Sequence, residues 1–197
     1  MTIEKIAKHL SKFTVGIAGA GGLGSNCAVG LVRSGIGRLI IADFDIVDRS
    51  NLNRQFYFAD QVGEKKVIAL KENLLRIGSK SRIDIHDVRI DADNIATLFN
   101  QCDIIVEAFD RAEMKEMLAE KVLTIWPGKP LIMGTGMAGY GSNELLRTRD
   151  LGDMLYACGD EESEISDLLP PMGPRVGIVA NMQANLVIEI LMKTERK

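Results

Sequence analysis

Apolar runs and amphipathic runs alternate along most of this chain. Short apolar runs typical of buried strands lie at residues 13–18, 38–42, 102–109 and 130–135, while residues 82–89 alternate as a half-exposed strand does. Between them the pattern predicts helices at residues 22–34, 63–77, 92–99 and 111–125. Strands and helices that alternate through such short connections predict an α/β fold, a Rossmann-like, doubly wound and mostly parallel sheet flanked by helices.

The pattern is less regular after residue 136. Residues 137–149 predict an antiparallel pair of strands, a C-terminal extension of the sheet. Residues 150–174 are acidic, carry three of the five prolines and predict a mobile loop. Residues 175–193 predict a long apolar helix that packs on the sheet. Because no linker is visible, we expect residues 1–197 to form one domain.

Composition and charge narrow the function classes. The 197 residues are 46% hydrophobic and 26% charged, as in ordinary globular domains. A net charge of −3 gives no overall basic field, so we expect neither nucleic acid nor a membrane as partner. The N-terminus lacks the features of a signal peptide. Three distant cysteines without a CxxC pair predict a cytoplasmic location and no structural zinc.

A glycine-rich loop follows the first predicted strand and opens the first predicted helix. The sequence GAGGLG at residues 19–24 is the dinucleotide-binding pattern in its required context. In this pattern Gly19 permits the tight turn, Gly21 lets the backbone approach a phosphate, and Gly24 lets the helix pack closely. The helix N-terminus then offers N–H groups to an anion. The alternative, a glycine-rich turn without a ligand, fits this context less well.

Asp43 ends the second predicted strand and is suited to accept hydrogen bonds from ribose hydroxyls. The alternative is a solvated acid at a strand end. The glycine loop and Asp43 do not distinguish NAD from ATP, since both nucleotides carry a ribose and phosphates.

The next segment, DFDIVDRSNLNRQ at residues 43–55, favours ATP. Asn51, Arg54 and Gln55 lie where the chain returns toward the nucleotide crevice, and Lys66 opens the next helix. A guanidinium and an ammonium at one crevice suit a triphosphate. On the opposite side, Asp110 ends the fourth predicted strand, where its carboxylate is placed to bind Mg²⁺.

Several of these pieces together resemble one family. They are GAGGLGS at 19–25, DFDIVDRSNLNRQ at 43–55, VGEKK at 62–66, EAFD at 107–110 and PRVGIVANMQAN at 174–185. The chain resembles the ubiquitin-activating-enzyme-like adenylyltransferases, the ThiF/MoeB/HesA superfamily. Its small size and last helix look most like the short ThiF proteins of thiamine biosynthesis.

The resemblance implies a nucleotidyltransferase that uses ATP and Mg²⁺. Its substrate would be the C-terminal glycine carboxylate of a small ubiquitin-like sulfur carrier protein, similar to ThiS and ending in Gly-Gly, and pyrophosphate would be released. The activated carrier would serve the synthesis of the thiamine thiazole. By resemblance Asp43 binds ribose and Asp110 binds the metal. The other implied nucleotide-binding residues are Gly19, Gly21, Gly22, Gly24, Asp45, Asn51, Arg54, Gln55 and Lys66.

By the same resemblance, Arg54, Lys66, Asp110 and Cys158 are the candidate catalytic residues. Cys158 is expected in an acidic loop, where relatives often place a cysteine that links covalently to the carrier. Acidic neighbours do not lower the pKa of a thiol, so a catalytic and an incidental role stay open. Cys27 and Cys102 are predicted to be buried packing residues.

The sequence also departs from the family pattern. It lacks an N-terminal arginine that reaches a partner's phosphates in larger members, and Lys5, Lys8 and Lys12 are interpreted as a solvated helix face. Two zinc-binding CxxC pairs are absent. Arg111 replaces an asparagine and Lys115 an arginine, a lysine still able to contact phosphate.

Three alternatives remain. In the first, the chain activates another carboxylate, that of a molybdopterin-synthase carrier or a modified tRNA base. An NAD-dependent oxidoreductase would leave Asn51, Arg54, Lys66 and Asp110 idle. A non-enzymatic module would dock a carrier without activating it. Apolar surface on the last helix and the habit of the family favour a homodimer.

Overall fold

The computed structural model describes residues 2–78 and 80–195. Within these residues one seven-stranded sheet runs in the order β3-β2-β1-β4-β5-β7-β6. The strands are β1 Thr14–Ala18, β2 Arg38–Asp43, β3 Arg82–Asp87, β4 Ile104–Glu107, β5 Leu131–Thr135, β6 Arg147–Asp150 and β7 Leu155–Gly159.

Six of the strands are parallel and β6 alone pairs antiparallel, with β7. This confirms the predicted doubly wound sheet with an antiparallel extension. The chain builds outward from β1 to β3 and then returns to add β4 on the other side of β1. Strand order therefore reverses between β1 and β4, and ligands of such sheets bind at the carboxyl ends of the strands beside this reversal.

Burial along the strands follows their place in the sheet. Every residue of the central β4 is buried, whereas β3 at one edge is mostly half-buried or exposed, as its alternating sequence predicts. At the other edge, all four residues of β6 are exposed.

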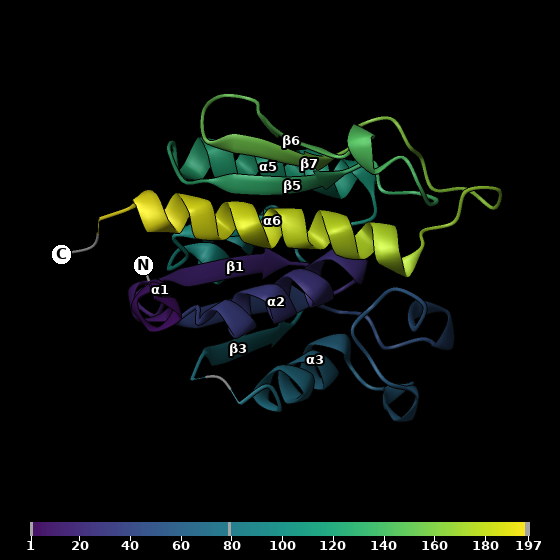
Figure 1. Cartoon of the computed structure of the whole chain (residues 1–197), viewed down its shortest axis with the longest axis horizontal. Helices are drawn as coiled ribbons and strands as arrows, with labels where there is room; N and C mark the ends of the chain where they lie inside the picture. Colours follow the sequence, from purple (N-terminus) through teal and green to yellow (C-terminus); the bar gives the residue numbers. More distant parts are fainter. Residues whose placement is uncertain (1, 79, 196–197) are drawn as a thin grey trace.

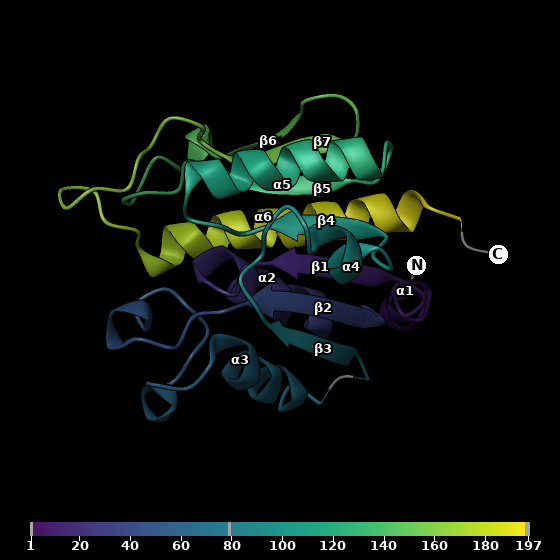
Figure 2. The ribbon, with the colours of Figure 1, turned by 180° about the vertical axis from the view of Figure 1, so that it is seen from behind.

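Helices cover both faces of the sheet. One face is covered by α1 Ile3–Leu10, α2 Gly22–Ser34, α3 Lys66–Leu75 and α6 Gly173–Lys193, which are in front in Figure 1. The other is covered by α4 Ile95–Phe99 and α5 Ala112–Ile125, seen in Figure 2. Each layer encloses its own apolar cluster. Short 3-10 helices lie at Arg49–Asn51, Ala59–Gln61 and Asn143–Leu145.

The helix α6 packs lengthwise on the molecule, as predicted. It contacts α2, α1, β5 and β7. Among the described helices, α6 alone is long and apolar enough to cross a membrane by length and composition, and 44% of that stretch is buried inside the protein. A core helix of this kind passes the same test, so the property is weak evidence for a membrane span.

Two predictions about the C-terminal half were wrong in position. The expected loop at 150–174 contains the strand β7, and the antiparallel pair lies at β6 and β7 rather than within 137–149. The strand conformation of β7 depends on a strand that is distant in the sequence. Strand β7 pairs in register with β5 and buries Ala157 and Cys158 there. The strand β4 also ends at Glu107, so Asp110 lies in the following loop.

Candidate functional site

The turn between β1 and α2 forms the centre of the site. Gly19 has a φ of +102°, and a Cβ there would lie 2.8 Å from the carbonyl oxygen of Ala108. A Cβ at Gly24 would lie 1.9 Å from the carbonyl oxygen of Gly19, so the helix packs as closely as predicted. The helix α2 begins at Gly22 with no side-chain cap at Gly21 and no acid in its first turn. Its first N–H groups therefore suit an anion.

Asp43 lies beside this turn and makes two backbone contacts that the sequence did not predict. Its Oδ2 accepts a hydrogen bond from the backbone N–H of Ala20 at 2.6 Å, and its Oδ1 accepts one from that of Asp45 at 2.8 Å. Burial raises the pKa of Asp43, although these two hydrogen bonds and the charge of Lys66 oppose the rise. Each oxygen retains a second lone pair, so ribose hydroxyls still have acceptors here.

The segment after Asp43 brings two cations to the turn. Lys66 is the first residue of α3, is 6% exposed and forms a 2.7 Å ion pair with Asp45. Arg54 packs by the turn, because a Cβ at Gly22 would lie 3.7 Å from its Cγ. Its Nη1 donates to the carbonyl of Ser50 at 3.0 Å.

The other polar residues of this segment have local roles. The side-chain Oδ1 of Asn51 accepts from the backbone N–H of Asp48 at 3.0 Å. The Nε2 of Gln55 lies 3.9 Å from where a Cβ of Gly21 would be, so Gln55 borders the turn. Its Oε1 is buried without a hydrogen-bond partner among the described residues.

Three residues that sequence reasoning missed join the glycine turn to this segment. Ser25 Oγ accepts from the backbone N–H of Phe56 at 3.0 Å, and Asn26 Nδ2 donates to the carbonyl of Arg54 at 2.9 Å. The buried Tyr57 donates its hydroxyl to the carbonyl of Ala20 at 2.7 Å. Polar residues directly after the glycines were the available signal for the first two.

Asp110 is exposed in the loop between β4 and α5. Just before it, Glu107 is fully buried and forms a 2.8 Å ion pair with Lys115. Burial raises the pKa of Glu107, and the charge and hydrogen bonds of Lys115 oppose the rise. The expected contact of Lys115 with phosphate is not supported, since its ammonium is engaged by Glu107.

Within residues 2–78 and 80–195, no group of three or more His, Cys, Asp or Glu side chains is arranged to bind a metal. Asp110 offers a single exposed carboxylate. Such a ligand fits Mg²⁺, which often uses one or two carboxylates together with water and substrate phosphates.

Cys158 is part of the sheet. It is fully buried in β7 instead of the expected loop, and burial raises the pKa of its thiol. Its Sγ lies 3.7 Å from Thr148 Oγ1. Cys27 and Cys102 are also buried, as predicted. A buried thiol with a raised pKa is poorly suited to nucleophilic attack.

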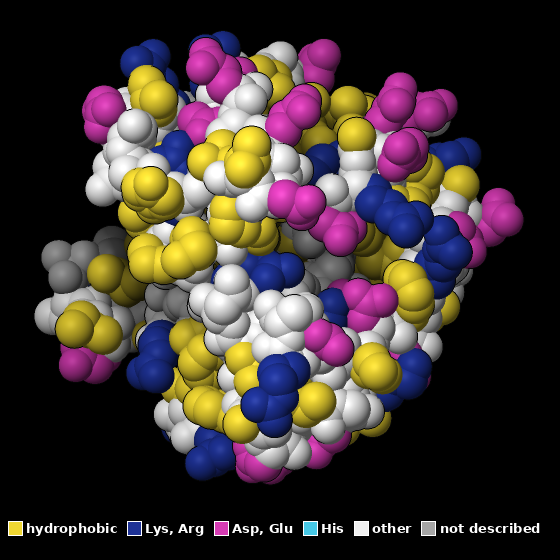
Figure 3. Space-filling model, turned by 90° about the vertical axis from the view of Figure 1, so that its right-hand side faces the viewer, with side chains coloured by type: hydrophobic (Ala, Val, Ile, Leu, Met, Phe, Trp, Pro, Cys, Tyr) yellow, Lys and Arg dark blue, Asp and Glu magenta, His cyan; other side chains and the backbone are white. Residues whose placement is uncertain are grey.

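The face that carries the loops at the carboxyl ends of the strands is shown in Figure 3. Lys and Arg side chains lie near its centre, with acidic and hydrophobic side chains around them. The structure thus brings together the glycine turn, Asp43, Asp45, Arg54 and Lys66, with the loop that carries Asp110 in contact with the turn through Ala108.

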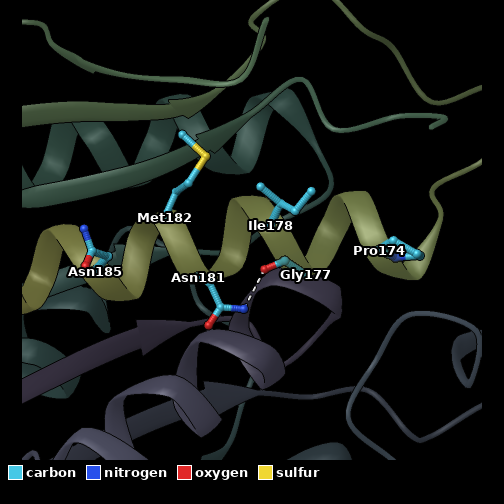
Figure 4. A pocket seen from close by; sticks show the side chains of 6 residues that line it. All are labelled: Pro174, Gly177, Ile178, Asn181, Met182 and Asn185. Carbon is cyan, nitrogen blue, oxygen red and sulfur yellow. Dashed lines mark hydrogen bonds between the residues drawn. The ribbon is translucent and has the colours of Figure 1, made fainter. Parts of the chain in front are cut away.

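A shallow pocket lies along the outer surface of α6 and is lined by Pro174, Gly177, Ile178, Asn181, Met182 and Asn185. Figure 4 shows Ile178 and Met182 pointing to the same side of the helix, while Asn181 donates to the carbonyl of Gly177 at 2.7 Å. The lining contains no titratable group, which distinguishes this surface from the charged glycine-turn site.

A model of the ThiF family matches residues 2–197, and the chain therefore belongs to the ThiF family. It is 28% identical over 199 residues to the adenylyltransferase and sulfurtransferase MOCS3 of Anopheles gambiae, an alignment that covers 94% of this chain and 43% of that protein. It is 30% identical over 128 residues to the sulfur carrier protein adenylyltransferase of Thermus thermophilus, covering 65% of this chain and 46% of that protein. The chain spans less than half the length of these relatives.

Solved structures share the fold. The E. coli tRNA N6-threonylcarbamoyladenosine dehydratase TcdA in complex with AMP gives a TM-score of 0.86 at 19% identity, covering 95% of this chain and 89% of that chain. The same protein in complex with ATP gives 0.83 at 22% identity, covering 96% of this chain and 89% of that chain. At these identities the likeness establishes the Rossmann-like fold.

Proposed function

We propose that this protein adenylylates the C-terminal glycine carboxylate of a ubiquitin-like sulfur carrier protein, using ATP. The observation that carries the proposal is the position of Arg54 and Lys66 beside an uncapped glycine turn at the point of strand reversal. The family membership and the name of the Thermus relative support it. An NAD-dependent oxidoreductase would need neither cation.

The reaction requires little covalent chemistry from the protein. A carboxylate oxygen of the carrier attacks the α-phosphorus of ATP, a new P–O bond forms, and the bond to the bridging oxygen breaks as pyrophosphate leaves. The carboxylate is already ionised near neutral pH, so no general base is needed. Catalysis then rests on positioning and on the stabilisation of developing negative charge.

We assign the roles from the contacts above. Asp43 accepts hydrogen bonds from the ribose while it fixes the glycine turn through Ala20. Arg54 and Lys66, with Asn51, bind the phosphates, and Lys66 remains paired with Asp45 on one side. Asp110 holds Mg²⁺, which when bound reduces the negative charge of the phosphate oxygens. Cys158 takes no part in this step.

The more specific parts of the proposal concern the carrier and the setting. We propose a ThiS-like carrier of thiamine biosynthesis, a homodimer formed through the outer surface of α6, and a cytoplasmic location. Three buried cysteines without disulfides fit a reducing compartment. The exposed Ile178 and the neighbouring Met182 supply apolar surface for a second copy.

Two measurements test the activity. Calorimetry with Mg²⁺ should detect binding of ATP and none of NAD, and the opposite result would refute adenylylation. Exchange of labelled pyrophosphate into ATP should then depend on a ThiS-like carrier ending in Gly-Gly. The matched control is the same carrier with a C-terminal carboxamide, which lacks the attacking oxygen anion and should support no exchange.

The carrier experiment also separates the remaining alternatives. Exchange with a molybdopterin-synthase carrier alone, or with a tRNA that bears a carboxylated base, would redirect the substrate but keep the reaction. Tight carrier binding without exchange would identify a docking module instead of an enzyme.

A further inference from the structure

A buried ion pair lies directly beneath the loop that carries Asp110. Glu107 is the last residue of β4 and is 0% exposed, and Lys115 is the fourth residue of α5. The ammonium of Lys115 lies 2.9 and 2.8 Å from the two carboxylate oxygens of Glu107, and 2.8 Å from the carbonyl oxygen of Gly134. An ammonium has three N–H donors, so these three acceptors use all of them.

The carboxylate of Glu107 holds backbone as well. Its Oε1 accepts from the N–H of Phe109 at 2.5 Å, and its Oε2 accepts from the N–H of Gly134 in β5 at 3.3 Å. The ion pair thereby joins the two ends of the segment 108–114, because Glu107 precedes this segment and Lys115 follows it. Asp110 lies within this segment, next to the Phe109 peptide whose N–H donates to Glu107.

The segment 108–114 also contacts the glycine turn. A Cβ at Gly19 would lie 2.8 Å from the carbonyl oxygen of Ala108 and 3.6 Å from a ring carbon of Phe109. Residues 108 and 109 therefore lie between the ion pair and the turn at which the phosphates are proposed to bind. A shift of this loop would move Asp110 relative to the turn.

Stability alone does not explain such a pair. The surrounding cluster between the sheet and α5 contains Ile105, Leu118, Val122 and Leu131, all fully buried. In such a setting an apolar pair of similar volume is often as stable as a buried ion pair, or more so. What an apolar pair would not supply is an acceptor for Phe109 N–H and a donor for the Gly134 carbonyl.

We propose that Glu107 and Lys115 are positioning residues that hold the 108–111 loop so that Asp110 can serve the bound nucleotide and its metal. The inference rests on the proposed function. It assigns Lys115 a role through Glu107 instead of direct contact with phosphate, and neither residue touches the substrate.

The test removes both charges together, because a single substitution would leave one buried charge unpaired and endanger the fold. The variants are Glu107→Leu/Lys115→Met, Asp110→Ala and the triple combination. A matched control, Arg38→Met/Asp84→Leu, removes an ion pair at the amino end of β2, where side chains are 25% and 24% exposed. ATP affinity is measured by calorimetry with Mg²⁺ and with EDTA, and thermal midpoints verify folding.

We expect the double variant to lose about 10- to 100-fold in ATP affinity with Mg²⁺, the usual effect of removing a residue that orients a metal ligand. With EDTA the loss should be under about twofold, and in the Asp110→Ala background the double substitution should add little, since both changes act on one group. The control pair should leave both affinities unchanged.

Hydrogen exchange gives a readout that needs no nucleotide. Peptides covering residues 107–115 should exchange faster in the double variant and at the wild-type rate in the control. Unchanged exchange, unchanged affinity with Mg²⁺ in a folded double variant, or a loss fully additive with Asp110→Ala would each overturn the inference. A wild-type protein that binds no ATP would refute the proposed function, while the exchange result would still report whether the pair holds the loop.

Discussion

Two arginines at the carboxyl edge of the sheet are used in different ways. Arg54, in the segment beside the glycine turn, is partly exposed and donates through Nη1 to Ser50 and Asn53. Arg175, near the start of α6, is 4% exposed and forms a 2.6 Å ion pair with Asp160.

The contacts of Arg175 join three parts of the chain. Its Nη1 donates to the carbonyl of Gly141, and its Nη2 donates to Asp160, whose Oδ1 accepts from the N–H groups of Glu162 and Ser163. An enclosed guanidinium of this kind holds loops in place through its hydrogen bonds, while a partly exposed one can still bind a ligand. For these two arginines, enclosure and not residue type separates the structural charge from the one that is available to a ligand.

Substitution of the enclosed arginine should have the largest effect on stability. Arg175→Met leaves Asp160 buried without its cation, and we expect the free energy of unfolding to fall by about 3–5 kcal/mol. Arg54→Met is the matched control and should cost about 1 kcal/mol or less, as for partly exposed groups. Denaturant unfolding measures both. Equal losses in the two variants would remove the distinction between the arginines.

The next largest effect is expected on catalysis, at the two cations beside the glycine turn. Arg54→Ala and Lys66→Ala should each lower carrier-dependent ATP–pyrophosphate exchange by about 10²–10³-fold, roughly 3–4 kcal/mol, because fixed cations act most where negative charge develops. ATP affinity, measured in parallel, should fall less than the rate. The control is Lys65→Ala, which removes the neighbouring lysine and its 3.2 Å ion pair with Asp87.

Two results would contradict this assignment. Exchange near the wild-type rate in both variants would mean that the site is misplaced. Equal losses in affinity and rate would mean that the two cations stabilise the bound substrate and the transition state alike.

The sequence predicted the glycine turn well because its determinants are local. Gly19 and Gly24 are five residues apart, and the flanking strand and helix are visible in the same short stretch. The spacing singled out Asp43 as a candidate ribose ligand, which stays a prediction, but its hydrogen bond to Ala20 could be seen only in the fold. Lys66 was placed correctly at the start of a helix, while its pairing with Asp45 was not foreseen.

Where the partners are distant, sequence reasoning failed. The Glu107–Lys115 and Arg175–Asp160 pairs depend on how α5 and α6 pack at the ends of the strands, which no local pattern reveals. The strand β7 was taken for a loop because acidic residues and prolines surround it, although pairing with β5 decides its conformation.

Acid should weaken the enclosed pair in a defined pH range. Burial alone would raise the pKa of Asp160, but the N–H groups of Ser163 and Glu162, the Ser163 hydroxyl and Arg175 together lower it to about 2 from 3.8. Because the folded-state pKa is the lower one, the stabilisation is present above about pH 4 and is lost as the pH falls toward 2.

We expect this group to contribute a loss of roughly 2 kcal/mol in unfolding free energy between about pH 5 and 2. The Asp160→Asn variant should lack this component, so the difference between the two pH profiles isolates it. Parallel profiles for wild type and Asp160→Asn would show that Asp160 does not titrate in this range.

The smallest effect is expected at Cys158. Its thiol is buried in β7 with Thr148 Oγ1 as neighbour, and adenylylation needs only carboxylate, ATP and Mg²⁺. Cys158→Ser should therefore change pyrophosphate exchange by less than about twofold, while a buried hydroxyl without full compensation costs about 1–3 kcal/mol of stability. Cys158→Ala serves as control for the polar substitution. If both folded variants fail in exchange, the β7 region positions the carrier tail, and the separation between a structural C-terminal region and a catalytic glycine turn would not hold.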